Sequence, residues 1–180
     1  MLKWFEQETK DEPNIVSSRV RLVRNWDQYR FPKTLTPQEG EELVKRLEFG
    51  LKNLEELDGT QYEYVYLEEL DELSRRALRE RRILNSAILN KKEIVGLIVS
   101  KDESTSLVLN GDDHIRMQFL SAGLCLNELW NRADKLDDYI NARFSYAFDE
   151  KYGYLTSFPT NVGTGMRATA IVHLPTLSMG

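Results

Sequence analysis

The stretch YGYLTSFPTNVGTGMRATAIVHLP, residues 152–175, joins two segments of strand-like composition through a polar, glycine-containing loop. Pro159 fixes one backbone dihedral angle, and Asn161, Gly163 and Gly165 permit left-handed backbone geometry. After the loop the alternation of small and apolar residues resumes, which favours a strand. A plain hairpin turn is the simplest interpretation of such a loop. Its threonine hydroxyls and the arginine that follows also make it suitable for binding an anion.

Outside this loop, the hydrophobic pattern predicts a mixed order of strands and helices, which is typical of the α+β class. The strands are expected over residues 15–23, 62–67, 93–99, 104–109, 155–158 and 166–174, and the helices over residues 36–58, 70–82, 116–131 and 137–148. Thr36, Pro37 and Glu39 form a helix-start signal. The break at residues 102–103 predicts a hairpin. Residues 1–180 are expected to form a single domain, whose first dozen residues make a short helix or arm.

The strand expected over residues 15–23 carries alternating arginines. Because successive side chains of a strand point to opposite faces, Arg19 and Arg21 share one face. Arg24 falls on the other face with Val20 and Leu22, where an ion pair at the end of the strand is the expected role. Taken singly, each arginine has the simpler interpretation of a solvated surface charge. A planar guanidinium also binds two phosphate oxygens at once, so paired arginines are suited to bridging adjacent phosphates.

The composition, with 41% hydrophobic and 29% charged residues, is that of an ordinary water-soluble globular protein. No apolar run approaches the ~20 residues of a membrane span, and the amino terminus is too short and too quickly acidic for a signal peptide. A cytoplasmic protein without membrane contact is therefore expected. The net charge of -5 argues against direct binding of nucleic acid, which requires a basic surface.

The sequence offers few soft metal ligands. Its single cysteine, Cys125, is expected within an apolar helical segment and excludes an intrachain disulfide. His114 and His173 are too few for a zinc site of histidines and cysteines. No metal site made of protein ligands is expected, and any metal should be a hard ion such as Mg²⁺, held through carboxylate and phosphate oxygen.

Three motifs occur in this chain: SSRVRLVRN at residues 17–25, NGDDHIRMQ at residues 110–118 and FPTNVGTGMR at residues 158–167. In this order they resemble the first nucleotide-binding strand, the acidic catalytic loop and the signature loop of the ATP:guanido phosphotransferases. The sequence of the third motif is most similar to that of the bacterial protein arginine kinases. With the strand that follows the signature loop, the match spans nearly the whole chain.

The resemblance implies a largely antiparallel sheet backed by helices, as in the glutamine-synthetase-like catalytic domain of guanido kinases. It also implies a domain that is incomplete at its C-terminus. Members of the family continue beyond the position of Gly180 with further strands, another nucleotide-binding arginine and a second catalytic carboxylate. ATP is implied as the phosphoryl donor, with Mg²⁺ held mainly through the nucleotide phosphates.

Phosphoryl transfer requires mainly the alignment of donor and acceptor and the neutralisation of charge on the transferring group. The resemblance assigns this neutralising role to Arg19, Arg21, Arg116 and Arg167, which stand where the family has phosphate-binding arginines. Arg82 is a looser match, because it lies near the position of a nucleotide-contacting histidine in the family.

A guanidinium acceptor must be oriented through its N–H groups and must lose a proton, which requires carboxylates. Asp112 and Asp113 are the catalytic candidates. The resemblance aligns Asp112 with the family's catalytic glutamate and Asp113 with the aspartate beside it. A second interpretation is that both acids cap a following helix. Phe158, Thr160 and Asn161 of the signature loop are expected to face the substrate.

The chain departs from the family pattern in both loops. The family's Asn-Glu-Glu-Asp-His reads NGDDH here, so one acid is lost at Gly111 and the presumed base, Asp112, is shorter by a methylene. Misplacement of a reacting group by about 1 Å can cost ~100-fold in rate. Phe158 stands where many members have a reactive cysteine, so thiol-directed inactivation should fail at this position.

These features favour a protein arginine kinase homologue that transfers the γ-phosphate of ATP to arginine side chains of proteins. The resemblance implies a role in stress-linked protein quality control, with a Clp-type protease system and a repressor client as partners. One alternative is a catalytically degenerate module that binds nucleotide or phosphoarginine, which Gly111, Asp112 and Phe158 favour. Another is a small-metabolite kinase for free arginine or creatine, although such enzymes carry a sizeable helical domain ahead of the first arginine strand.

We expect the 180-residue chain, tested alone, to show no guanidino kinase turnover. The reason is that the resemblance places part of the site in segments that follow Gly180 in the family. A phosphoarginine assay checks this expectation. A phosphoarginine signal that depends on Arg167 and Asp112 would contradict it.

Overall fold

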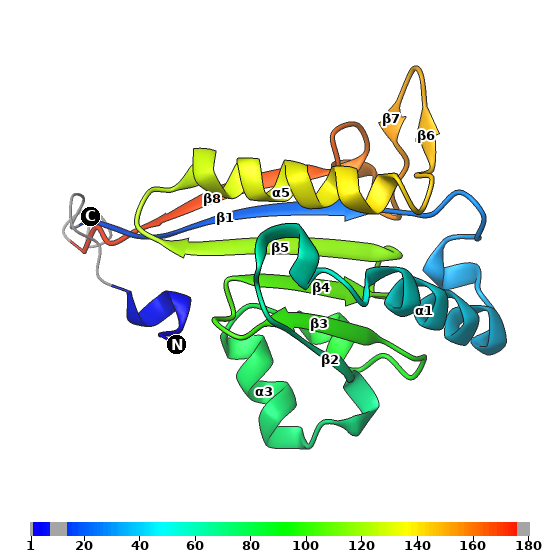
Figure 1. Cartoon of the computed structure of the whole chain (residues 1–180), viewed down its shortest axis with the longest axis horizontal. Coiled ribbons are helices and arrows are strands. Elements are labelled where there is room, and N and C mark those ends of the chain that lie inside the picture. Colours follow the sequence, from blue (N-terminus) through cyan, green and yellow to red (C-terminus); the bar gives the residue numbers. More distant parts are fainter. Residues whose placement is uncertain (1, 8–13, 176–180) are drawn as a thin grey trace.

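A six-stranded antiparallel sheet, with strand order β2-β3-β4-β5-β1-β8, forms the centre of this computed structural model (Figure 1). The structure describes residues 2–7 and 14–175. The strands are β1 (Ile15–Arg24), β2 (Tyr62–Tyr66), β3 (Gly96–Ser100), β4 (Thr105–Leu109), β5 (Ile115–Ala122) and β8 (Met166–Val172). A separate hairpin of β6 (Phe148–Asp149) and β7 (Gly153–Tyr154) projects beyond the end of the sheet (Figure 1). The predicted α+β class, with a largely antiparallel sheet, is confirmed.

The α-helices are α1 (Pro37–Leu51), α2 (Glu55–Asp58), α3 (Glu72–Glu80), α4 (Ser86–Leu89) and α5 (Leu126–Asn141). Short 3-10 turns are η1 (Trp4–Glu6), η2 (Pro32–Thr34), η3 (Leu67–Glu69) and η4 (Pro159–Asn161). Helix α1 begins as predicted, because the Thr36 hydroxyl accepts a hydrogen bond from the Glu39 backbone N–H and the Glu39 carboxylate accepts one from the Thr36 N–H. None of the helices within the described residues has the length and apolar character that a membrane span requires.

The two faces of the sheet are covered differently. On one face, α1 and α5 pack against a large buried core that includes Leu22 of β1 and Met117 of β5. On the other face, a smaller cluster forms around Leu97, Val108 and Ile88 of α4. Among the described residues, this smaller cluster takes no member from β5, β1 or β8. The side chains that these three strands present on that face therefore lie outside this apolar cluster.

The helix predicted over residues 116–131 is wrong in its first half, because β5 occupies that part of the chain. Apolar residues alternate with Arg116 and Gln118 along β5, which is the period of a strand, and pairing with β1 and β4 satisfies the backbone. Because a strand and not a helix follows the acidic loop, Asp112 and Asp113 do not cap a helix. Cys125 is half-buried and lies just ahead of α5 rather than within a helix.

Two other predicted elements also differ from the structure. The helix predicted over residues 137–148 is correct only as far as Asn141, where α5 ends, and the rest of that range is not helical. Phe144, beyond that end, reaches the core by packing edge-on against Trp26 with 4.7 Å between ring centroids. Residues 155–158, predicted as a strand, form a loop, because the short pairing of β6 with β7 ends before them. The arm expected over the first dozen residues includes η1, and its later part lies outside the described residues.

Arg24 makes the ion pair expected at the end of β1. Its side chain is 3% exposed, and it donates hydrogen bonds to both carboxylate oxygens of Asp137 in α5, at 3.1 Å from Nε to Oδ1 and 2.7 Å from Nη2 to Oδ2. Nη1 donates to the carbonyl of Thr164 at 2.9 Å. The guanidinium also lies 3.7 Å from the centre of the Tyr154 ring. One buried cation therefore ties β1 to α5 and to the loop before β8.

Replacing Asp137→Asn should lower the free energy of unfolding by about 3–5 kcal/mol, because it leaves the buried Arg24 without a counter-ion. Urea denaturation measures this loss. Glu72→Gln is the matched control, since it removes the acid of the exposed Arg76–Glu72 pair on α3 and should cost less than about 1 kcal/mol. Equal losses in the two variants would contradict the assignment.

Candidate active site

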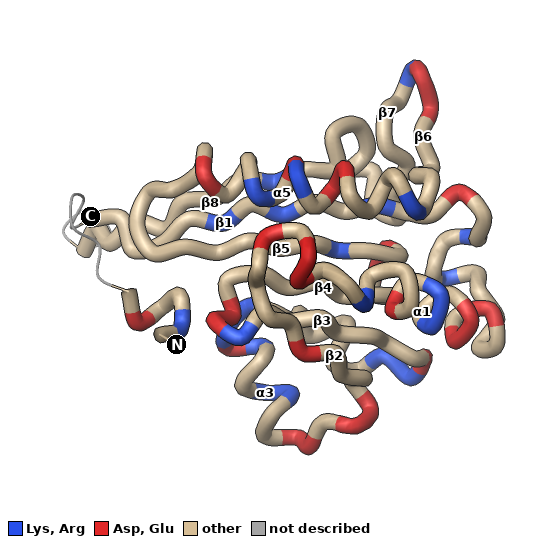
Figure 2. The backbone as a smooth tube through the Cα atoms, in the orientation of Figure 1, with Lys and Arg blue, Asp and Glu red and all other residues tan. Residues whose placement is uncertain are grey.

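Three adjacent strands bring arginines to the face of the sheet that is opposite α1 and α5. Arg19 and Arg21 lie on β1, and Arg21 is directly opposite Arg167 of β8. Arg116 of β5 is opposite Val23, two residues beyond Arg21. Directly opposite residues of antiparallel strands share one face, so the strand pairing gathers these arginines on one side of the sheet. Figure 2 shows the basic positions along β1 and β5 within an otherwise mixed distribution of charge.

The gathered guanidinium groups repel one another. Burial and then the charge of Arg21 lower the pKa of Arg116 to about 10. Burial followed by Arg167 lowers the pKa of Arg21, and burial followed by Arg21 lowers the pKa of Arg19. Burial and like charge both disfavour the protonated form of a basic group. A bound polyanion would relieve this repulsion, so this face of the sheet favours binding of an anion.

Most of the predicted site residues line one pocket of about 160 Å³. Its lining consists of Arg21, Val23, Asp112, Asp113, Arg116, Phe158, Thr160, Asn161 and Arg167. The structure thus brings together three arginines, both acids and three residues of the signature loop from segments far apart in the sequence. Arg19 and Arg82 line a second pocket of about 420 Å³ further along β1.

Asp113 is the centre of a buried hydrogen-bond network. It is 2% exposed, and its Oδ1 accepts hydrogen bonds from Asn25 Nδ2 at 2.8 Å and from the Ser157 backbone N–H at 2.6 Å. The side-chain oxygen of Asn25 accepts from the His114 backbone N–H at 2.9 Å. The carboxylate therefore joins the end of β1, the acidic loop and the signature loop, and it holds Phe158 and its neighbours beside the arginines.

His114 is a buried anchor beside this network. Burial lowers its pKa, so the neutral imidazole is the stable form at neutral pH. Nδ1 accepts a hydrogen bond from the Trp26 backbone N–H at 2.9 Å, which places the ring proton on Nε2. Nε2 then donates to the Arg30 carbonyl at 2.8 Å. These bonds orient the chain that follows β1 relative to the acidic loop.

Asp112 is the more accessible of the two acids. Its Oδ2 accepts a hydrogen bond from Asn85 Nδ2 at 3.0 Å, and its negative charge acts on both Arg21 and Arg116. Asp112 therefore lines the pocket together with the arginines and the residues of the signature loop.

Sequence reasoning missed three residues that support the acids: Asn25, Asn85 and Lys91. Lys91 Nζ donates hydrogen bonds to the carbonyl of Asn110 at 2.6 Å and to that of Gly111 at 3.0 Å, and burial lowers its pKa. Only Asn25, the last residue of the SSRVRLVRN motif, had a signal in the sequence. Lys91 and Asn85 reach the acidic loop through tertiary packing alone.

Two glycines of the loops are closely surrounded, and at Gly165 there is no room for a side chain. Gly165 has φ 61°, and an added Cβ would lie 2.5 Å from Arg24 Nη1 and 2.7 Å from the Val23 carbonyl oxygen. At Gly111, an added Cβ would lie 3.2 Å from both Ile88 and Val108. The loss of the family's acid at Gly111 is thus matched by apolar packing around that position.

The donor set fits a nucleoside triphosphate better than a bare metal ion. Within residues 2–7 and 14–175, no three histidine, cysteine or acidic side chains are placed to hold a metal. Mg²⁺ that arrives with ATP needs only one or two carboxylates, because phosphates and water supply its other ligands. Asp112 and Asp113 are the carboxylates available in this pocket, and Arg21, Arg116 and Arg167 are the available phosphate ligands.

Comparison with known sequences identifies related proteins. A family profile described as ATP:guanido phosphotransferase, C-terminal catalytic domain, matches residues 42–180. A protein-arginine kinase of Clostridium tetani is 37% identical over 179 residues, which cover 99% of this chain and 52% of that protein. A protein-arginine kinase of Geobacillus sp. (strain WCH70) is 38% identical over 174 residues, covering 97% and 48% respectively. The chain spans about half the length of these curated relatives.

Solved structures share the fold. The substrate-free duplicated taurocyamine kinase from Schistosoma mansoni superposes with a TM-score of 0.80 and 26% identity over 92% of this chain and 24% of that chain. Lombricine kinase, at 21% identity, matches in fold with a TM-score of 0.80 over 99% of this chain and 52% of its own. With the profile match over most of its length, the chain belongs to the ATP:guanido phosphotransferase family.

Proposed function

We propose that this chain is the part of a protein-arginine kinase that binds ATP and receives an arginine side chain of a protein substrate. The observation that carries the proposal is the single pocket in which Arg21, Arg116 and Arg167 meet Asp112. The curated protein-arginine kinases match the chain along nearly its whole length, which supports a protein as the acceptor rather than free arginine or creatine.

The phosphates of ATP are proposed to lie along the arginines. Arg21 and Arg167 are directly opposite each other in the β1–β8 pair, and each offers a planar guanidinium group to neighbouring phosphate oxygens. Arg116 is 7% exposed and donates one hydrogen bond to the Ile83 carbonyl, so its guanidinium is held in place before the ligand arrives. Charge-assisted hydrogen bonds from a guanidinium group that is already held in place are strong, because little side-chain freedom is lost on binding.

The nucleoside is proposed to occupy the pocket of about 420 Å³ beyond Arg19. Arg19 and Arg82 stand at this pocket, whereas Val16, Leu120 and Ile171 give it apolar walls. A triphosphate that runs along β1 would place its charged end among the arginines and its base against the apolar surface. Arg82 is held there because its carbonyl accepts a hydrogen bond from Gln118 Nε2 at 2.8 Å.

The acceptor arginine is proposed to enter beside Phe158, Thr160 and Asn161. In the transfer, a guanidino nitrogen attacks the γ-phosphorus, the bond from phosphorus to the bridging oxygen of ADP breaks, and a guanidinium proton passes to the Asp112 carboxylate. Asp113 positions the acceptor loop through its bond to Ser157. Bound Mg²⁺ would neutralise charge on the phosphates, with Asp113 as its carboxylate ligand while Asp112 accepts the proton.

The cellular setting belongs to the same proposal. A cytoplasmic role in stress-linked protein quality control, with a Clp-type protease system and a repressor client, is what the resemblance to bacterial protein arginine kinases implies. The support for these partners is the similarity of the signature-loop sequence to that of the bacterial protein arginine kinases.

Arg21→Gln and Arg167→Gln should each weaken binding of ATP with Mg²⁺ by roughly 10- to 100-fold, because each removes hydrogen bonds between charged groups. Isothermal titration calorimetry measures the dissociation constants. Arg76→Gln on α3 is the matched control, since it removes an exposed arginine of a surface ion pair and should leave binding unchanged. Site variants that bind ATP like the unaltered chain would overturn the phosphate assignment.

Asp112→Asn should retain ATP binding but lower phosphoarginine formation by ~100-fold or more, because the amide cannot accept the guanidinium proton. The assay uses a protein that carries its whole encoded sequence, with an unfolded arginine-containing polypeptide and free arginine as parallel acceptors and phosphorus NMR as the readout. Comparable turnover of free arginine would contradict a protein acceptor. ATP binding without any phosphoarginine in the unaltered protein would favour a regulatory nucleotide-binding module instead.

A further inference from the structure

One wall of the pocket proposed for the nucleoside comes from the N-terminal turn η1. Trp4 and Phe5 line this pocket together with Arg19 of β1. Their ring centroids are 5.7 Å apart and the ring planes meet at 87°, so the two rings pack edge to face against each other at this wall. We call this pair the aromatic wall. A flat heterocycle is the ligand chemistry that such a pair recognises, because bases stack on aromatic side chains.

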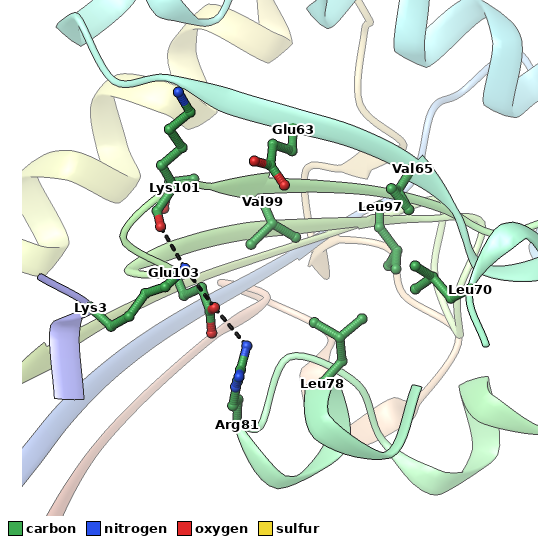
Figure 3. A pocket seen from close by; sticks show the side chains of 11 residues that line it. Lys3, Glu63, Val65, Leu70, Leu78, Arg81, Leu97, Val99, Lys101 and Glu103 are labelled. Carbon is green, nitrogen blue, oxygen red and sulfur yellow. Dashed lines mark hydrogen bonds and ion pairs between the residues drawn. The ribbon is translucent and has the colours of Figure 1, made fainter. Parts of the chain in front are cut away.

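The turn between β3 and β4 holds the aromatic wall in place. The Trp4 backbone N–H donates a hydrogen bond to the Asp102 carbonyl at 3.0 Å. Lys3 Nζ donates to the Lys101 carbonyl at 2.8 Å and pairs with Glu103 Oε1 at 2.9 Å (Figure 3). Three contacts from two consecutive residues therefore dock η1 on this turn.

Glu103 is the central residue of this docking. It is 6% exposed and has a φ of 60°, which is uncommon for a residue other than glycine. Arg81, just after α3, pairs with the same Oε1 at 2.7 Å, so Lys3 and Arg81 share one buried carboxylate (Figure 3). Arg81 is followed by Arg82, which stands at the same pocket as the aromatic wall. One carboxylate thus fixes two sides of that pocket.

The contacts of Glu103 depend on its charge. A neutral side chain at this position would leave Lys3 and Arg81 as two cations in close proximity, with no acid to hold them together. The arginines of the phosphate pocket do not depend on this carboxylate, because Arg21, Arg116 and Arg167 are placed by the strands of the sheet. Loss of the docking should therefore alter the base end of the ligand site and spare the phosphate end.

We propose that the aromatic wall recognises the base of the bound nucleotide and that Glu103 is the positioning residue that holds this wall against the site. This inference rests on the proposed function, since the arginines identify the ligand as a nucleoside triphosphate. It adds a specificity element, contributed by the N-terminal turn, that acts on the base and not on the phosphates.

Calorimetric titrations with ATP and with inorganic tripolyphosphate, both with Mg²⁺, test the proposal. Trp4→Ala should weaken ATP binding by roughly 5- to 100-fold, the range that stacking of one base provides, and should leave tripolyphosphate binding within about twofold. Trp130→Ala is the matched control, because Trp130 is a 40% exposed tryptophan on α5, and it should change neither affinity. Circular dichroism of each variant verifies that the fold is kept.

A second series tests the positioning role of Glu103 without altering the aromatic residues. Glu103→Gln and Lys3→Gln should show the same selective loss of ATP affinity, whereas Lys3→Arg, which keeps the charge, should retain most of it. Equal ATP affinity in Trp4→Ala and the unaltered chain, or equal loss for ATP and tripolyphosphate, would overturn this inference alone. If the unaltered chain binds neither ligand, the proposed function fails, and the inference fails with it.

Discussion

The pairing of β1 with β5 on one side and with β8 on the other is the interaction on which the rest of this structure depends. The same ten-residue strand buries Val20 and Leu22 on one face and presents Arg19 and Arg21 on the other. A register shift of one residue would exchange these faces and place guanidinium groups in the apolar core. Burial of the core and assembly of the cationic face are therefore one constraint, satisfied by one register.

This arrangement has an electrostatic cost. Burial and the charge of neighbouring guanidinium groups lower the pKa of Arg19, Arg21 and Arg116, which means that the free protein holds these three cations in an unfavourable position. The stability that offsets this cost lies elsewhere, in the core under α1 and α5 and in the buried pair of Arg24 with Asp137. A ligand that brings negative charge would remove the repulsion, so binding and stability are linked in this fold.

Several features could be predicted from the sequence because they depend on neighbours along the chain. The capped start of α1 at Thr36, the period-two strand that places Arg19 beside Arg21, and the hairpin between β3 and β4 are all local. The first half of the helix predicted over residues 116–131 was wrong, because the apolar content of that half suits either structure and only its period-two alternation favours a strand. Its pairing with β1 and β4 decided in favour of a strand, and pairing with distant strands is not visible in a short window.

By itself, the sequence determined the family, the α+β class and the residue types available for phosphate and guanidinium chemistry, because motifs and short-range periodicity carry that information. Only the tertiary structure decided which of these residues meet. It placed Asp113 under the signature loop, Lys91 under the acidic loop and Glu103 between two cations from opposite ends of the N-terminal half. The physical reason is that each of these contacts joins segments distant in sequence, whose approach is set by packing of the sheet and not by local conformation.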